Sequence, residues 1–194
     1  MPDHPVTTLG LRLAGWQFET DPPPVPRCVV LAVPHTSNWD GLLLLALARS
    51  IGLEMSWMIK DSWLRGPMGT VMRQLGAVGI DRAKANNMVQ AMVDEFARRD
   101  RLVLVIPPEG TRSRTDYWKS GFYRIALGAG VPVVPGYLDF ARKRGGLGPP
   151  IDLTGDVHVD MDAIRAFYAA QAPTAHRPGD VGPIRLRDED TERA

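Results

Sequence analysis

The chain has 194 residues, 44% of them hydrophobic and 23% charged, which is the composition of an ordinary globular protein with one core. Its net charge of +1 argues against a broad nucleic-acid-binding face, although a local basic pocket is compatible with it. The single cysteine, Cys28, excludes an internal disulfide and a CxxC zinc site, and it fits a reducing compartment. No run approaches the roughly 20 apolar residues of a membrane-spanning helix, and no signal-peptide pattern opens the chain. We therefore expect a cytoplasmic protein that can lie on a membrane without crossing it.

The predicted elements alternate between helices and buried strands. Val6, Leu9, Leu13 and Trp16 recur at helical spacing and predict a short helix suited to a membrane interface. Cys28–Val33 is apolar at every position, which is typical of a strand buried on both faces. The later elements are helices over 40–51, 67–75, 86–99, 121–130 and 160–172, strands over 54–59, 102–106 and 133–140, and a short sheet edge over 151–153.

This alternation predicts an α/β fold: a single layered domain with a largely parallel central sheet flanked by helices. We expect one domain over residues 1–172, of which residues 1–20 include the interfacial helix. Pro, Gly and charged residues dominate residues 173–194, so a flexible tail is predicted there. In such folds, sites gather where strands end and lead into helices.

The first polar cluster at such a joint is Pro34–Asp40. It places His35 and Asp40 five positions apart, so the carboxylate can fold back onto one imidazole nitrogen and leave the other as a general base. By spacing alone, the same residues also fit a loop histidine and an aspartate that caps the next helix. Ser37 lacks a nucleophile elbow, and a metal site on His35, Asp40 and Glu109 lacks a second histidine at ligand spacing, so we expect no metal.

A second polar cluster, Pro107–Ser113, follows the strand predicted to end at residue 106. Gly110 lets the backbone approach a ligand, while Thr111, Arg112 and Ser113 supply donors suited to an oxyanion. A strand-end turn with a surface arginine would show the same composition.

Two further cations lie at predicted strand ends. Arg82, with Lys84 nearby, comes from a separate strand end and could hold one phosphate together with Arg112. Lys60 could join them, although a lysine at a strand end is also commonly solvated.

In this order the clusters resemble the signature blocks of the glycerolipid acyltransferases, the family of 1-acylglycerol-3-phosphate acyltransferase. His35 and Asp40 match the block His-x-x-x-x-Asp, and Gly76 to Arg82 match a block that ends in Ile-Asp-Arg. Ile106 to Ser113 match Phe-Pro-Glu-Gly-Thr-Arg-Ser, and Val131 to Pro135 match Val-Pro-x-x-Pro. The resemblance spans roughly residues 28 to 140 and points to a compact, bacterial-type member without transmembrane segments. Its departures are Pro34 for the usual Asn, Ile106-Pro107-Pro108 for Phe-Pro, and Val78-Gly79 where an aromatic residue is common.

The resemblance implies an O-acyltransferase. His35 would take a proton from a hydroxyl of a phosphate-bearing (lyso)glycerolipid as it attacks an acyl thioester, with Asp40 orienting the ring. Arg82 and Arg112 would hold the acceptor phosphate, and Glu109 would position the acceptor or an arginine. The resemblance also implies substrate binding by Gly110, Thr111 and Ser113, and Lys60 is added to them from its place at a strand end.

The resemblance also implies the partners: a lipid acceptor, acyl-CoA or acyl carrier protein as co-substrate with no other cofactor, and a peripheral contact with the inner face of the cell membrane. Apart from the first helix, a membrane contact could come from Met55, Trp57, Met58, Trp63 and Met68, which core packing would explain equally well. Two alternatives stay open: a thioesterase or phosphatase that uses the His–Asp pair on water, and a non-catalytic binder of lipid phosphate.

Overall fold

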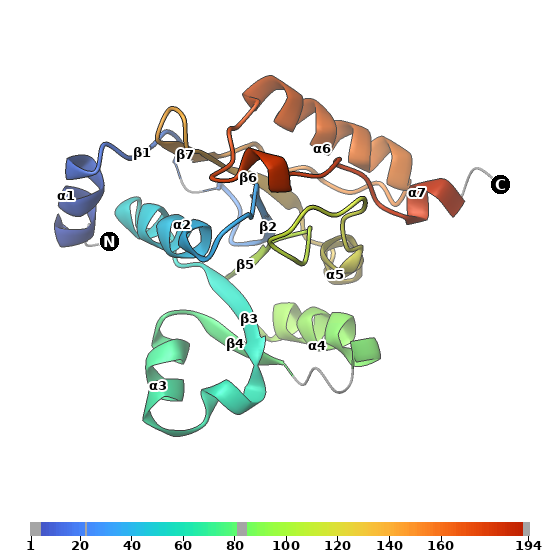
Figure 1. The fold of residues 1–194 in the computed structure, drawn as a ribbon. Coiled ribbons are helices and arrows are strands. Elements are labelled where there is room, and N and C mark those ends of the chain that lie inside the picture. Colours follow the sequence, from blue (N-terminus) through green and yellow to red (C-terminus); the bar gives the residue numbers. More distant parts are fainter. Residues whose placement is uncertain (1–4, 22, 81–84, 192–194) are drawn as a thin grey trace.

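One seven-stranded sheet organises the chain, in the order β1-β7-β6-β2-β5-β3-β4 (Figure 1). The computed structural model describes residues 5–21, 23–80 and 85–191. The strands are β1 (Gln17–Phe18), β2 (Arg27–Val33), β3 (Ser56–Lys60), β4 (Ala77–Ile80), β5 (Leu102–Ile106), β6 (Val133–Asp139) and β7 (Arg144–Leu147). All pairings are parallel except that between β6 and β7.

Helices flank the sheet on both faces, which confirms the predicted α/β architecture. They are α1 (Pro5–Leu13), α2 (Asn38–Ser50), α3 (Gly66–Gln74), α4 (Ala85–Arg98), α5 (Gly121–Ala129), α6 (Val157–Gln171) and α7 (Asp188–Thr191), with 3₁₀ turns η1 (Asp61–Leu64) and η3 (Pro178–Asp180). Side chains of α4, α5 and α6 form the core on one face, and those of α2 form the core on the other.

The central strand β2 is buried on both faces, as its unbroken apolar sequence predicts. Val29 and Leu31 pack into the core beside α5, whereas Cys28 and Val30 pack into the core beside α2. Burial raises the pKa of the Cys28 thiol to about 12, so the thiol is protonated at neutral pH and serves as a small core residue.

The sheet opens between β3 and β5 near the carboxyl ends of these strands. The two strands pair at Ser56 with Leu104 and at Trp57 with Val105, and β3 then continues to Lys60 beside β4. Figure 1 shows β3, β4 and α3 set apart as a lobe below the rest of the sheet. The opening leaves room for a cavity between this lobe and the main body.

The far edge of the sheet differs from the prediction. Residues 151–153 contribute only an isolated bridge between Ile151 and Val133, and β1 and β7 form the edge instead. The strand β7 follows a turn in which the Asp139 carboxylate accepts the backbone N–H groups of Ala141 and Arg142, at 3.0 and 3.1 Å.

The segment after α6 also differs from the flexible tail that its composition predicts. The described residues 173–191 pack on the domain: Leu186 is fully buried, and its backbone N–H donates to Glu189 Oε2 at 2.7 Å. The guanidinium of Arg165 on α6 in turn donates to Glu189 Oε1 at 2.7 Å. Buried apolar contacts and paired charges therefore hold this segment.

The predicted interfacial helix is only partly exposed. Leu9 and Leu13 of α1 face outward, but Trp16 is buried, with its ring 5.1 Å from that of Phe140. In the described part of the chain, no helix has the length and apolar character needed to cross a membrane.

Candidate active site

The two polar clusters meet because the strands that carry them are neighbours. His35 follows β2 and Glu109 follows β5, and these parallel strands pair along the whole of β5, up to Leu31 with Ile106. The backbone N–H of His35 donates to Glu109 Oε1 at 3.4 Å. The guanidinium of Arg112 donates to the side-chain oxygen of Asn38. The carboxyl edge of the sheet thus gathers both loops into one site, as expected for such a fold.

The carboxylate of Asp40 accepts hydrogen bonds from the backbone of the loop that carries His35. Its Oδ2 accepts the N–H groups of Thr36 at 2.6 Å and Ser37 at 2.8 Å, and its Oδ1 accepts the Ser37 hydroxyl at 2.5 Å. Ser37 is the N-cap residue of α2, so Asp40 performs the capping role that its spacing allowed. Among the described residues, its carboxylate bonds to the loop and not to the imidazole, and it acts on His35 through its charge.

His35 is half-buried and lines the cavity. Burial lowers the pKa of its imidazole, the charge of Asp40 opposes that shift, and the guanidinium of Arg112 adds to it. The balance keeps the ring neutral at physiological pH, and a neutral ring can accept a proton.

Glu109 lies behind the histidine loop and is not among the residues that line the cavity, whereas the prediction was that it positions the acceptor or an arginine. Its side chain is 5% exposed, and its Oε2 has no hydrogen-bond partner in the described structure. Burial raises the pKa of this carboxyl to about 7. The geometry makes Glu109 a support for His35 rather than a ligand-facing group.

Gly110 allows the tight turn in the loop after β5. Gly110 has a φ of +64°, a left-handed conformation that glycine adopts without strain, and its N–H donates to the carbonyl of Pro107 at 3.1 Å. That N–H is therefore engaged in the turn. Thr111 and Arg112 line the cavity, and Arg112 is exposed to it.

Two predicted substrate-binding residues lie outside the cavity. Ser113 and Lys60 are exposed but are not among the residues that line the cavity. Arg82 falls outside the described residues, so its predicted part in a phosphate clamp stays a prediction.

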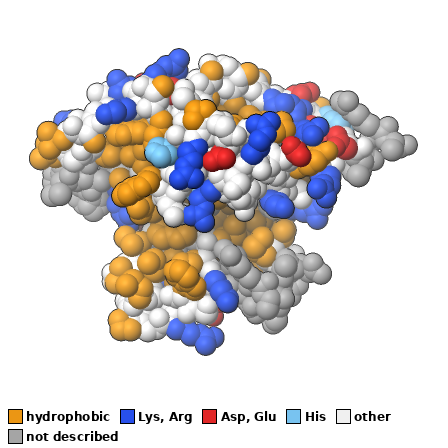
Figure 2. Space-filling view, in the orientation of Figure 1, with side chains coloured by type: hydrophobic (Ala, Val, Ile, Leu, Met, Phe, Trp, Pro, Cys, Tyr) orange, Lys and Arg blue, Asp and Glu red, His pale blue; other side chains and the backbone are white. Residues whose placement is uncertain are grey.

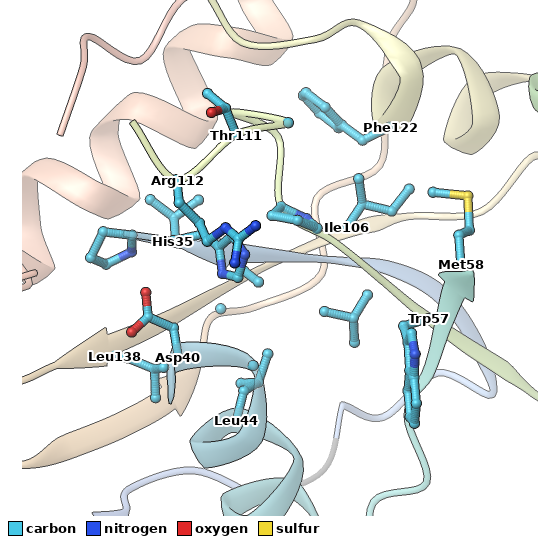
Figure 3. A pocket seen from close by; sticks show the side chains of 18 of the residues that line it. His35, Asp40, Leu44, Trp57, Met58, Ile106, Thr111, Arg112, Phe122 and Leu138 are labelled. Atoms are coloured by element: carbon cyan, nitrogen blue, oxygen red, sulfur yellow. The ribbon is translucent and has the colours of Figure 1, made fainter. Parts of the chain in front are cut away.

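The site opens onto one large cavity of about 1050 Å³. Figure 3 shows His35, Asp40 and Arg112 at one end of it, and Trp57 and Met58 on the far side, beyond Ile106. The wall between these two ends is apolar. It consists of side chains from the cores on both faces of the sheet and from the strands at the opening between β3 and β5. Its members include Leu44, Leu45, Trp57, Met58, Met88, Val105, Ile106, Phe122, Ile125 and Leu138.

Two features of the cavity were not assigned from the sequence. Lys119 adds a second cation to the lining; its only signal was the family-like Lys-Ser-Gly segment that contains it. Trp57 and Met58 line the cavity, whereas the pattern allowed either core packing or a membrane surface.

Much of the chain matches a known protein family. The profile of the Acyltransferase family matches residues 20–139, which include both loops of the site. The chain belongs to the Acyltransferase family. This confirms the resemblance drawn from the signature blocks.

Individual relatives of this acyltransferase-family chain are distant. The 1-acyl-sn-glycerol-3-phosphate acyltransferases of Salmonella typhimurium and Salmonella typhi are 41% identical over 58 residues, which is 28% of this chain and 23% of each relative. The chain therefore matches less than a quarter of the length of these curated proteins. The crystal structure of the 1-acyl-sn-glycerophosphate (LPA) acyltransferase PlsC from Thermotoga maritima superposes with a TM-score of 0.58 at 14% identity. That likeness covers 85% of this chain and 75% of the other, and it shows a shared fold.

Proposed function

We propose that this protein transfers a fatty acyl group from a thioester, carried by coenzyme A or acyl carrier protein, to a hydroxyl of a phosphate-bearing (lyso)glycerolipid. The observation that carries the proposal is the position of His35: a neutral imidazole at the polar end of a large apolar cavity, with Arg112 near it and Lys119 in the same lining.

The proposed reaction needs one base and no nucleophile from the protein. The imidazole of His35 accepts the proton of the acceptor hydroxyl while the hydroxyl oxygen attacks the thioester carbonyl carbon. The tetrahedral intermediate collapses, the C–S bond breaks, and the imidazolium returns the proton to the leaving thiolate. The negative charge of Asp40 stabilises the imidazolium between these steps.

The apolar part of the cavity suits the acyl chain of the donor. Its wall consists of aliphatic, methionine and aromatic side chains, which favour a hydrocarbon chain over water. Met58 and Met88 are unbranched and adaptable, as a site for flexible chains requires. The chain would enter at His35 and extend toward Trp57.

The cations at the polar end suit the acceptor phosphate. Arg112 is exposed in the cavity with one side of its guanidinium held by Asn38, so its direction is fixed before a ligand binds. Lys119 lies in the same lining, and its backbone N–H donates to the carbonyl of Pro108 at 2.7 Å, which ties it to the Arg112 loop. Arg82 follows β4, whose carboxyl end lies at the same edge of the sheet, and would join them.

We further propose that one apolar face contacts the membrane from which the acceptor comes. We assign to this face seven apolar side chains of α1, α2, η1 and α3 that are between 48% and 81% exposed: Leu9, Leu13, Trp39, Leu42, Trp63, Met68 and Val71. Figure 2 shows hydrophobic side chains gathered on both sides of the constriction between the β3–β4–α3 lobe and the main body. Leu42 also lines the cavity, so this face continues into the site. Arg12, Arg65 and Arg73, exposed on the same elements, can attract anionic lipid.

A thiol-release assay with and without acceptor separates the proposal from its alternatives. The purified protein is given acyl-CoA alone, then acyl-CoA with a panel of lysophospholipids and glycerol phosphate. The proposal predicts thiol release that depends on a phosphate-bearing acceptor and yields the acylated lipid. A thioesterase would release thiol at the same rate without acceptor, whereas a phosphatase or a non-catalytic binder would release none.

A further inference from the structure

The C-terminal segment, residues 174–186, lies outside the matched family region, which ends at residue 139. It nevertheless contacts both loops of the candidate site. Figure 1 shows it in red, returning from α6 across the carboxyl edge of the sheet toward α7.

Its first contact is with the histidine loop. The backbone N–H of Arg177 donates to Thr36 Oγ1 at 3.2 Å, and Thr36 is 1% exposed. The backbone N–H of Thr36 in turn donates to Asp40 Oδ2 at 2.6 Å. The segment is anchored at this point, because Phe140 N–H donates to the carbonyl of Thr174 at 2.8 Å.

Its second contact is with the loop that carries Arg112. The guanidinium of Arg114 donates to the carbonyl of Val181 at 2.5 Å. The backbone N–H of Trp118 donates to the carbonyl of Arg185 at 2.8 Å, and Trp118 and Leu186, both buried, form a parallel bridge. Backbone and side-chain bonds thus join the segment to this loop from Arg114 to Trp118.

Between these bonds, Gly182 lies against the loop so closely that no other residue fits. A Cβ atom at Gly182 would be 1.9 Å from the carbonyl oxygen of Thr115. A Cβ atom at Gly179, in the same segment, would meet nothing within 4 Å. Neither glycine has a left-handed φ, so only the space around the added Cβ atom decides whether an alanine is tolerated at either position.

We infer that Arg177 and Gly182 are positioning residues that fix the His35 loop and the Arg112 loop relative to each other. The inference rests on the proposed function, because it assigns the segment a part in that reaction. One continuous piece of chain bonds to both loops, so a shift of the segment moves the base and the phosphate-binding arginine apart. Misplacement of reacting groups by about 1 Å can cost on the order of 10² in rate.

The test compares Gly182→Ala with its matched control Gly179→Ala. We expect Gly182→Ala to lower kcat/KM for the lysolipid about 10- to 100-fold while KM for the thioester changes less than about twofold, since the apolar wall is untouched. Gly179→Ala should stay close to wild type. Equal activity of the two variants would overturn the inference.

A second arm does not depend on turnover. Hydrogen exchange of the substrate-free protein should quicken at residues 35–40 and 110–118 in Gly182→Ala but not in Gly179→Ala. Unchanged exchange in both loops would contradict the coupling, whatever the reaction proves to be. Thr36→Val, which removes the acceptor for Arg177, should lower kcat, and Thr36→Ser should restore it. If the wild type shows no transfer at all, the proposed function fails, and the exchange arm still decides whether the segment couples the loops.

Discussion

The backbone N–H of His35 donates to Oε1 of Glu109 at 3.4 Å, while Oε2 of the same buried carboxyl has no partner in the described structure. The loop that carries the proposed general base is therefore supported by an acidic group that is removed from solvent. Because burial raises the pKa of Glu109 to about 7, this support changes its charge near physiological pH.

Glu109→Gln should remove a pH dependence of stability. Between pH 4.5 and about 7 the folded protein keeps the Glu109 proton and the unfolded chain releases it, so rising pH favours unfolding. The loss in the free energy of unfolding amounts to about 3 kcal/mol across this window, at about 1.4 kcal/mol per pH unit. Urea unfolding at pH 5 and pH 8 measures it. The variant should lose less stability than the wild type on going to pH 8, and equal losses would show that Glu109 is already ionised in the folded state.

The activity should fall as His35 becomes protonated. Since burial and Arg112 lower the pKa of His35 below 6.5, the acid limb of kcat/KM should have its midpoint below 6.5. Arg112→Gln should move the midpoint upward, because it removes a positive charge that disfavours the imidazolium, and should weaken acceptor binding as well. If the midpoint does not move in Arg112→Gln, the group whose titration is observed is not His35.

Two variants of Asp40 should distinguish its structural role in the loop from its electrostatic role toward His35. Asp40→Ala loses the bonds to Thr36 and Ser37, and we expect the free energy of unfolding to fall by about 0.5–2 kcal/mol, as for loss of a helix cap. Asp40→Asn retains an oxygen acceptor and should cost less stability, yet it should lower kcat because the imidazolium loses its counter-charge. Chemical denaturation and pH–rate profiles of both variants provide the measurements. If Asp40→Asn retained full kcat, the role of Asp40 would be limited to capping the helix.

Met58 should set the preferred length of the acyl chain. Met58→Ala enlarges the far side of the cavity and should shift the optimum toward longer acyl-CoA donors, whereas Met58→Trp should shift it toward shorter ones. Each buried methylene is worth about 0.8 kcal/mol, so the shift should appear as about a fourfold change in relative rate per methylene. Met72→Ala is the control, since Met72 of α3 is half-buried and lies outside both the lining and the apolar face. An unchanged chain-length profile in the Met58 variants would place the donor chain elsewhere.

The apolar face should mediate vesicle binding. Trp39→Ser combined with Trp63→Ser removes two side chains that are 68% and 65% exposed. We expect flotation with anionic vesicles to weaken by at least about tenfold, because each such side chain contributes roughly 1.5–3 kcal/mol when buried. Val159→Ser on α6, where Val159 is 53% exposed, is the matched control. If all three proteins float alike, another surface meets the membrane.

The sequence predicts those parts of the fold that depend on local pattern. The strand around Val30 is apolar on both faces and is buried on both, and the polar residues after it and after Ile106 meet because those strands are neighbours. The bond between Asp40 and the loop was foreseen as the competing interpretation, and it forms because capping satisfies backbone N–H groups that the helix leaves free.

The parts that the sequence does not predict depend on tertiary contacts. In β7, Gly145 and Gly146 pack against the side chains of Leu47 and Tyr137, so close contact and not strand propensity forms this edge. The C-terminal segment has few apolar residues, and its hold on the domain comes from backbone bonds and from Leu186, which composition does not reveal.

The most direct measurement is lysolipid-dependent thiol release from acyl-CoA by His35→Ala, compared with wild type and with His158→Ala, a histidine of α6 outside the cavity. We expect a loss of about 10²–10⁴ in kcat for His35→Ala and wild-type activity for His158→Ala. Acceptor-dependent transfer that persists undiminished in His35→Ala would contradict the assignment of His35 as the base.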